Sequence, residues 1–129
     1  MTNSQTPAAL AGATAEAVRQ LTSVTISTRD GWRYPGDAYA VTGSLLRAVG
    51  FLGQLYGQID ALIEHLDRDD RLTAPEGQTV QYLLAEIHSG LRQGSRGAGE
   101  MRHGLTLAAD RIGRLAYRFP NTHPDTEED

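Results

Sequence analysis

Cysteine and lysine are both absent from this chain of 129 residues, and aromatic residues make up only 6% of it. Without cysteine, the chain can form no disulfide, no thiolate nucleophile and no cysteine-based zinc site. All twelve basic residues are arginine, a bias more typical of a GC-rich genome than of a phosphate-binding site. Alanine, glycine and leucine are abundant instead, which suits closely packed helices.

Long apolar runs are also missing. The longest stretch without charge, between Arg47 and Asp60, is too short to span a bilayer. The N-terminal segment "MTNSQTPAALAGA" lacks the basic start and apolar core of a signal peptide, so we expect a cytoplasmic protein with no membrane partner. The length fits one domain with a single modest core.

The first third of the chain predicts a short helix and an irregular segment. Thr6 followed by Pro7 is typical of a helix start, and we expect a disordered N-terminus over 1–6 and a weakly amphipathic helix over 7–22. Residues 23–34 alternate in polarity around Asp30-Gly31, a pattern that fits either a small β-hairpin or an ordered loop. Asp37 is then a credible N-cap.

The clearest pattern predicts a long helix over 38–66. Its apolar residues alternate spacings of four and three, which is a heptad seam: Leu45, Val49, Leu52, Tyr56, Ile59, Ile63 and Leu66. Ala48, Leu55 and Leu62 widen this seam on one flank, and a wide stripe implies packing against more than one neighbour.

A second seam predicts a helix over 75–118. Thr73-Ala74-Pro75-Glu76 matches a capping box, and Pro120 ends the pattern before an acidic tail over 120–129 that we expect to be disordered. The large apolar residues of this seam are Val80, Leu84, Ile87, Leu91, Met101, Leu105, Ile112 and Leu115. We therefore predict an all-α domain over 7–119, a hairpin or bundle of two long antiparallel helices with one short helix before them.

Glycines are frequent in both seams, yet the heptad register continues through them, which favours a continuous second helix over the alternative of a bend or break near Ser95 to Gly99. Each glycine inside a helix costs roughly 1 kcal/mol relative to alanine, so we expect close packing to compensate. The predicted close-packing positions are Gly50, Gly53, Gly57, Gly90, Gly94 and Gly97. At 1.5 Å per residue the helix over 75–118 would be about 65 Å long and the helix over 38–66 about 43 Å. This leaves roughly 20 Å of seam around Ile112 and Leu115, which either the short N-terminal helix or a second copy of the chain could cover.

Motifs for chemistry are weak. Glu100-x-x-His103 has the spacing of di-metal carboxylate bundles, but the chain has one copy and both residues point away from the seam. "GSRGAGE" lacks the lysine and the preceding strand of a phosphate loop, and no nucleophile or dinucleotide motif occurs. We expect no catalytic residue, no metal and no cofactor.

The basic residues of the second long helix support one alternative. Residues 90–118 have a local charge of +4, with six arginines that could contact phosphates: Arg92, Arg96, Arg102, Arg111, Arg114 and Arg118. A solvated helix face explains them more simply, because they are spread around the helix and no aromatics are interleaved with them. Nucleic acid is therefore an alternative partner, and it is not the favoured one.

The favoured hypothesis is a non-enzymatic interaction or scaffold protein that forms a homodimer or pairs with another helical protein. A second alternative follows from size and the two-helix seam, which resemble the WXG100 family of secreted helical hairpins. That family places Trp-x-Gly in the turn between its helices, whereas Trp32-Arg33-Tyr34 precedes both long helices and the turn reads "DRDDRL". The Tyr-x-x-x-acid pattern occurs at Tyr56 to Asp60 and Tyr82 to Glu86, inside the helices.

Overall fold

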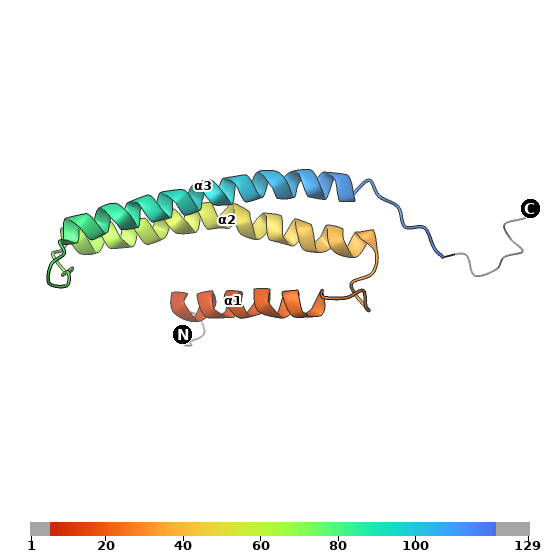
Figure 1. Ribbon diagram of the computed structural model, residues 1–129, viewed down its shortest axis with the longest axis horizontal. Helices are drawn as coiled ribbons and strands as arrows, with labels where there is room; N and C mark the ends of the chain where they lie inside the picture. Colours follow the sequence, from red (N-terminus) through yellow and green to blue (C-terminus); the bar gives the residue numbers. More distant parts are fainter. Residues whose placement is uncertain (1–5, 121–129) are drawn as a thin grey trace, which may run out of the picture. The chain divides into compact units, whose positions relative to one another are not determined.

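The structure is a computed structural model that describes residues 6–120. These residues form three helices, α1 (Pro7–Val24), α2 (Pro35–Arg68) and α3 (Val80–Ile112), and no strand (Figure 1). The all-α prediction of one short and two long helices is confirmed. No helix in this part of the chain has the length and hydropathy needed to cross a membrane. The expected disorder at 1–5 and 121–129 lies outside the described residues.

The chain divides into two compact units, and the expected single domain over 7–119 stays a prediction. Among the described residues, one unit contains α1, the loop that follows it and residues 116–120; the other, Tyr39–Leu115, contains most of α2 and all of α3. Each unit is described by itself.

The start of α1 is the one that the sequence predicts. The Thr6 hydroxyl accepts a hydrogen bond from the Ala9 N–H at 3.1 Å, and Pro7 occupies the first helical position. Glu16 and Arg19 form an i, i+3 ion pair at 2.6 Å, which lowers the pKa of the Glu16 carboxyl. None of the residues of α1 is buried, so the helix has an apolar side without a core of its own.

The segment between α1 and α2 is an ordered loop, and the β-hairpin alternative is wrong. A single antiparallel bridge joins Arg29 to Trp32, with the Trp32 N–H donating to the Arg29 carbonyl at 2.8 Å. Gly31 has a φ of +82° and completes the turn after Asp30. Two paired residues around one turn are too few to build strands.

Helix α2 begins at Pro35, so Asp37 lies inside the first turn and the N-cap prediction for it is wrong. The Oδ2 atom of Asp37 accepts hydrogen bonds from the N–H groups of Arg33 and Tyr34, both at 2.9 Å. A carboxylate at the third helical position that reaches back to the preceding N–H groups performs the capping-box role. These hydrogen bonds hold the pKa of the Asp37 carboxyl below its ordinary value.

The predicted start of the second long helix is wrong by five residues. Instead of a capping box at Thr73, the Gln78 N–H donates to the Pro75 carbonyl at 3.0 Å, and Gly77 adopts a φ of +90°. This is a β-turn with glycine in the left-handed region, which a helix cannot contain. Thr79 therefore caps α3, accepting a hydrogen bond from the Tyr82 N–H at 3.1 Å.

Helix α3 is continuous through its glycine-rich segment, residues 90–104, as predicted from the unbroken register. It ends at Ile112 rather than at 118, because Gly113 forms the cap and Leu115 lies beyond the helix. With 34 residues in α2 and 33 in α3, both helices are about 50 Å long. The predicted length mismatch, with its uncovered seam around Ile112 and Leu115, is therefore wrong.

Candidate interaction surface

Helices α2 and α3 lie side by side and antiparallel (Figure 1). Two contacts fix their register near the middle. A Cβ placed on Gly94 would stand 3.0 Å from Cζ of Tyr56, and one placed on Gly53 would stand 3.9 Å from Oγ of Ser95. Toward the open end of the hairpin, the Tyr39 ring comes as close to Gly113.

The contact between the two helices buries very little. Val49 on α2 and Ala98 on α3, with 7% and 6% of their surface exposed, are the only buried residues described in these helices. Other predicted interface residues are half-buried: Leu45, Leu52, Tyr56, Ile63, Leu66, Val80, Leu84, Leu91, Leu105 and Ile112. Ile59, Ile87, Met101 and Leu115 are exposed, so the hairpin leaves part of its predicted interface open.

Six of the exposed large apolar side chains lie on one side of the hairpin. A groove of about 560 Å³ runs between the helices there, lined by Leu52 and Tyr56 of α2 and by Gly94, Gly97, Ala98, Glu100 and Met101 of α3. Leu55 and Ile59 follow Leu52 by three and seven residues, so they extend the same side of α2. Ile87 precedes Gly94 by seven and extends the same side of α3. We define the apolar face as Phe51, Leu55, Ile59, Leu62, Ile87 and Met101.

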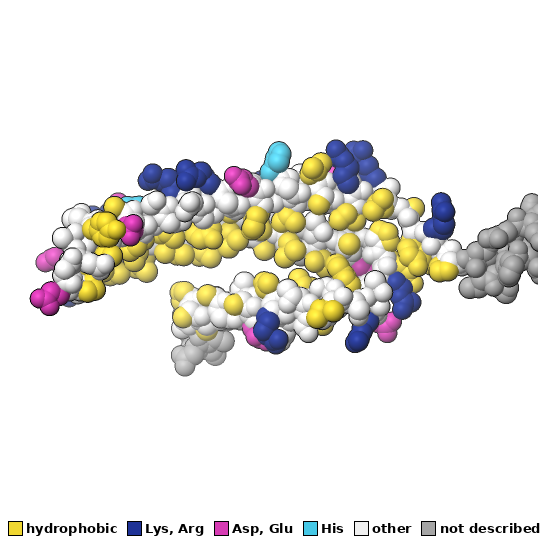
Figure 2. All heavy atoms as spheres, viewed as in Figure 1, with side chains coloured by type: hydrophobic (Ala, Val, Ile, Leu, Met, Phe, Trp, Pro, Cys, Tyr) yellow, Lys and Arg dark blue, Asp and Glu magenta, His cyan; other side chains and the backbone are white. Residues whose placement is uncertain are grey.

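These six residues are exposed to a degree that is unusual for large apolar side chains on neighbouring helical turns. Phe51 exposes 70% of its surface, Leu62 55% and Met101 50%. Figure 2 shows apolar side chains as a band along the hairpin. A contiguous apolar surface of this kind is typical of a docking site.

The opposite side of the hairpin is polar. A smaller groove of about 200 Å³ is lined there by Gly53, Tyr56, Gly57, Asp60, His88, Leu91, Arg92 and Ser95. Nδ1 of His88 lies 2.7 Å from Oδ1 of Asp60, an oxygen that is shielded from solvent. The two side chains therefore form an ion pair across the helices when His88 is protonated.

The predicted close-packing glycines behave differently from one another. Only Gly94 lies tightly against a neighbour, the Tyr56 ring, while Gly53 is at ordinary contact distance from Ser95. A Cβ at the other four would meet nothing within 4 Å. The prediction that these glycines let the two helices of the hairpin approach closely is therefore wrong for Gly50, Gly57, Gly90 and Gly97. The periodicity of glycine could not show this, because it does not reveal which side of a helix has a neighbour.

The predicted arginines do not form one site. Arg92, Arg96, Arg102, Arg111 and Arg114 are exposed, and basic side chains stand along the edge of α3 that faces away from α2 (Figure 2). Arg114 pairs with Asp110 at 3.1 Å, and Arg111 contacts the same carboxylate. Arg118 belongs to the other unit. This arrangement favours a solvated helix face over a phosphate-binding surface.

Metal ligands are not gathered anywhere in the described residues. Glu100 and His103 are both exposed on α3, and no group of three potential ligands occurs within residues 6–120.

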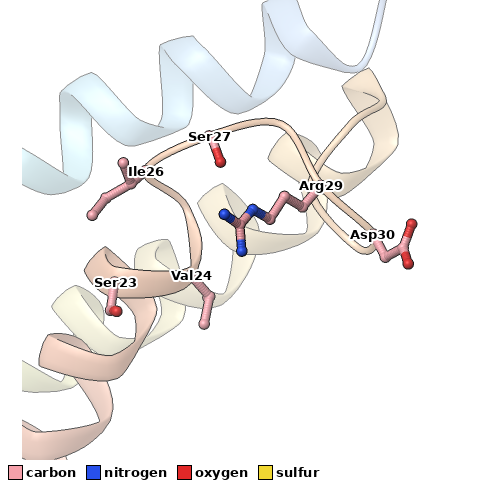
Figure 3. Close-up of a pocket in the computed structure, with 6 residues that line it drawn as sticks. All are labelled: Ser23, Val24, Ile26, Ser27, Arg29 and Asp30. Carbon is pink, nitrogen blue, oxygen red and sulfur yellow. The ribbon is translucent and has the colours of Figure 1, made fainter.

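The other unit has two small features. Tyr117 packs edge-on against Tyr34 and Phe119, with ring centroids 4.8 and 4.9 Å away, and Trp32 lines a hollow of about 340 Å³ beside Tyr34 and Tyr117. A second hollow of about 500 Å³ lies at the end of α1 (Figure 3).

The second hollow offers no reactive constellation. Its lining is Ser23, Val24, Ile26, Ser27, Arg29 and Asp30. The Arg29 side chain extends back toward Val24, whereas the Asp30 carboxylate points away (Figure 3). The Arg29 guanidinium and the Asp30 carboxylate therefore point apart, and the rest of the lining is aliphatic and hydroxyl groups, so the hollow holds no reactive pair.

Sequence reasoning missed two parts of the hairpin surface. Phe51 lies outside the heptad seam and its flank, although its position four residues before Leu55 places it on the same side. The Asp60–His88 pair depends on the register between the helices, for which the sequence of one helix holds no signal.

No protein-family model, no curated protein and no solved structure matches the chain. The resemblance to the WXG100 family therefore depends on size and helix pattern alone.

Proposed function

We propose that this chain is a non-enzymatic interaction protein that self-associates through the apolar face of the α2–α3 hairpin. The observation that supports the proposal is the exposure of six large apolar side chains on one side of a hairpin with only two buried residues. Fully burying a leucine-sized side chain is worth about 1.5–3 kcal/mol, so a partner that covers this face gains several kcal/mol.

The geometry of the face favours a helical partner. A hairpin of two long helices covers one side of each helix, and the remaining apolar stripe has the width that a third and fourth helix need. Two such hairpins placed face to face form a four-helix bundle, in which each helix contacts two neighbours. A second copy supplies a matching face without any other protein.

Light scattering after gel filtration tests the proposal. The full chain, of 14.0 kDa, should elute with about twice that mass at micromolar concentration. The variant L55E/L62E should be a monomer that retains its helical circular dichroism, because charges on the apolar face oppose its burial.

Ala61 and Ala85 offer a matched control on the polar side of the same half of the hairpin. Both are exposed; Ala61 follows Gly57 by four residues and Ala85 precedes Arg92 by seven, and Gly57 and Arg92 line the polar groove. A61E/A85E, which adds the same two charges, should remain a dimer. A monomeric wild-type chain, or a dimer that L55E/L62E leaves intact, would contradict the proposal.

A further inference from the structure

Charge is distributed unevenly along the length of the hairpin. The Gly53–Ser95 contact lies near the middle of both helices and divides the hairpin into two halves. The tip half, residues 54–95, has seven carboxylates against three arginines and a net charge of −4. The open-end half, residues 39–53 and 96–115, has five arginines against two carboxylates and a net charge of +3.

The apolar face lies across this midpoint. On α2 it extends from Phe51 to Leu62, and on α3 it extends from Ile87 to Met101. Tyr56 and Gly94, which touch one another, lie near its centre. A two-fold axis that passes through that centre, in the plane of the interface and across the hairpins, therefore places the apolar face of one copy against the apolar face of the other. The same surface of both copies then forms the contact, which is an isologous interface.

We propose that the second copy docks antiparallel, with the acidic tip half of each hairpin against the basic open-end half of the other. This inference rests on the proposed self-association and adds its orientation. In the antiparallel arrangement both ends of the interface join opposite charges. In the parallel arrangement the two tips, at −4 each, meet one another, and like charges that face across an interface oppose association.

The charged residues that matter lie beyond the ends of the apolar face. Asp69 and Glu76 are exposed at the tip, and Arg111 and Arg114 are exposed at the open end. They frame the apolar contact as a polar rim, which sets orientation more than affinity. Their contribution should weaken with salt, because exposed charges are screened within about 8 Å at physiological ionic strength.

A spin label at the tip measures the orientation directly. The chain has no cysteine, so Q78C gives one label per copy in the exposed loop before α3. Dipolar spectroscopy on the dimer should give a distance of about 50 Å, the length of the hairpin. A parallel dimer would instead bring the labels within about 20 Å, roughly two helix diameters.

Charge reversal provides a second, independent measurement. D69R/E76R should weaken dimerisation about tenfold at low salt, because in the antiparallel arrangement it sets arginines opposite Arg111 and Arg114. R111E/R114E should weaken it to a similar degree, because it sets glutamates opposite Asp69 and Glu76. Combining all four substitutions should restore affinity to within about threefold of the wild type. In a parallel dimer, D69R/E76R would strengthen association, because it would reduce the repulsion between two acidic tips.

The outcomes separate the two proposals. A wild-type monomer would overturn the proposed function and this orientation together. A dimer with tips about 20 Å apart, or one that the fourfold variant fails to restore, would overturn the antiparallel arrangement and leave self-association standing.

Discussion

At the start of α2, the half-buried carboxylate of Asp37 accepts hydrogen bonds from the backbone N–H groups of Arg33 and Tyr34, which no helical carbonyl can reach. Because both hydrogen bonds favour the charged form, the pKa of Asp37 in the folded chain lies below its ordinary value. A lowered folded pKa stabilises the folded state above the unfolded pKa, and this contribution is lost as the pH falls through the folded pKa.

We therefore expect D37A to melt at a lower temperature than the wild type at neutral pH, with the difference disappearing as the solution is acidified below the normal aspartate range. Thermal melts followed by circular dichroism across that range measure the effect. D37N is the control, because its amide oxygen accepts hydrogen bonds without titrating. A D37A deficit that stays constant at all pH values would show that the charge of Asp37 has no part in capping.

Two glycines in the long helices should respond in opposite ways to the same substitution. G50A adds a methyl group where nothing lies within 4 Å, so the helix gains up to about 1 kcal/mol of intrinsic propensity. G94A gains the same propensity but places the methyl group about 3.0 Å from the Tyr56 ring, which must move and loosen the middle of the hairpin. Urea unfolding should show G50A more stable and G94A no more stable than the wild type. Equal stabilisation of both variants would contradict the tight Tyr56–Gly94 contact.

Among the elements, α2 ends with a backbone motif that normally uses glycine. The Arg71 N–H donates to the Leu66 carbonyl and the Asp70 N–H donates to the Asp67 carbonyl, both at 3.0 Å, which is a Schellman motif. Asp70 adopts the left-handed conformation that this motif requires, with a φ of 56°. Left-handed backbone costs a non-glycine residue about 1–2 kcal/mol, and aspartate tolerates it better than most.

We expect D70G to stabilise the hairpin by about 0.5–1 kcal/mol, since the relieved backbone strain exceeds the added flexibility of the unfolded chain. D70A should destabilise it, because alanine has neither the freedom of glycine nor the polar side chain of aspartate. Urea midpoints of the three proteins provide the comparison. An unchanged midpoint in D70G would mean that Asp70 bears no strain.

Element identity could be predicted from the sequence, and element boundaries only in part. The 4–3 spacing from Leu45 to Leu66 and from Val80 to Ile112 predicts α2 and α3, because apolar periodicity reports a face along many turns. The predicted start of the second long helix was wrong because Pro75 can begin either a helix or a β-turn. The left-handed conformation of Gly77 selects the turn. Similarly, the repeat that includes Leu115 continues for a few residues after the helix has ended.

The candidate surface was predictable to a similar degree. The extra stripe of Ala48, Leu55 and Leu62 indicates a second neighbour, and the exposure of Leu55 and Leu62 agrees with it. The glycines at 50, 57, 90 and 97 were misassigned because the distance between two backbones depends on their relative rotation. That rotation is a property of the pair of helices, and neither sequence pattern contains it.

For the molecule as a whole, thermal stability should depend on protein concentration. A hairpin with two buried residues has a small core of its own, so much of the apolar burial should occur only when a second copy covers the apolar face. Mass action then makes the Tm of the wild-type chain rise with each tenfold increase in concentration, by a few degrees for a domain of this size. Melts of L55E/L62E should be lower and independent of concentration, because that variant cannot bury the apolar face, whereas A61E/A85E should follow the wild type. A wild-type Tm that stays constant from low to high micromolar concentration would mean that the isolated hairpin supplies all of the stability, and the apolar face would then need a different occupant.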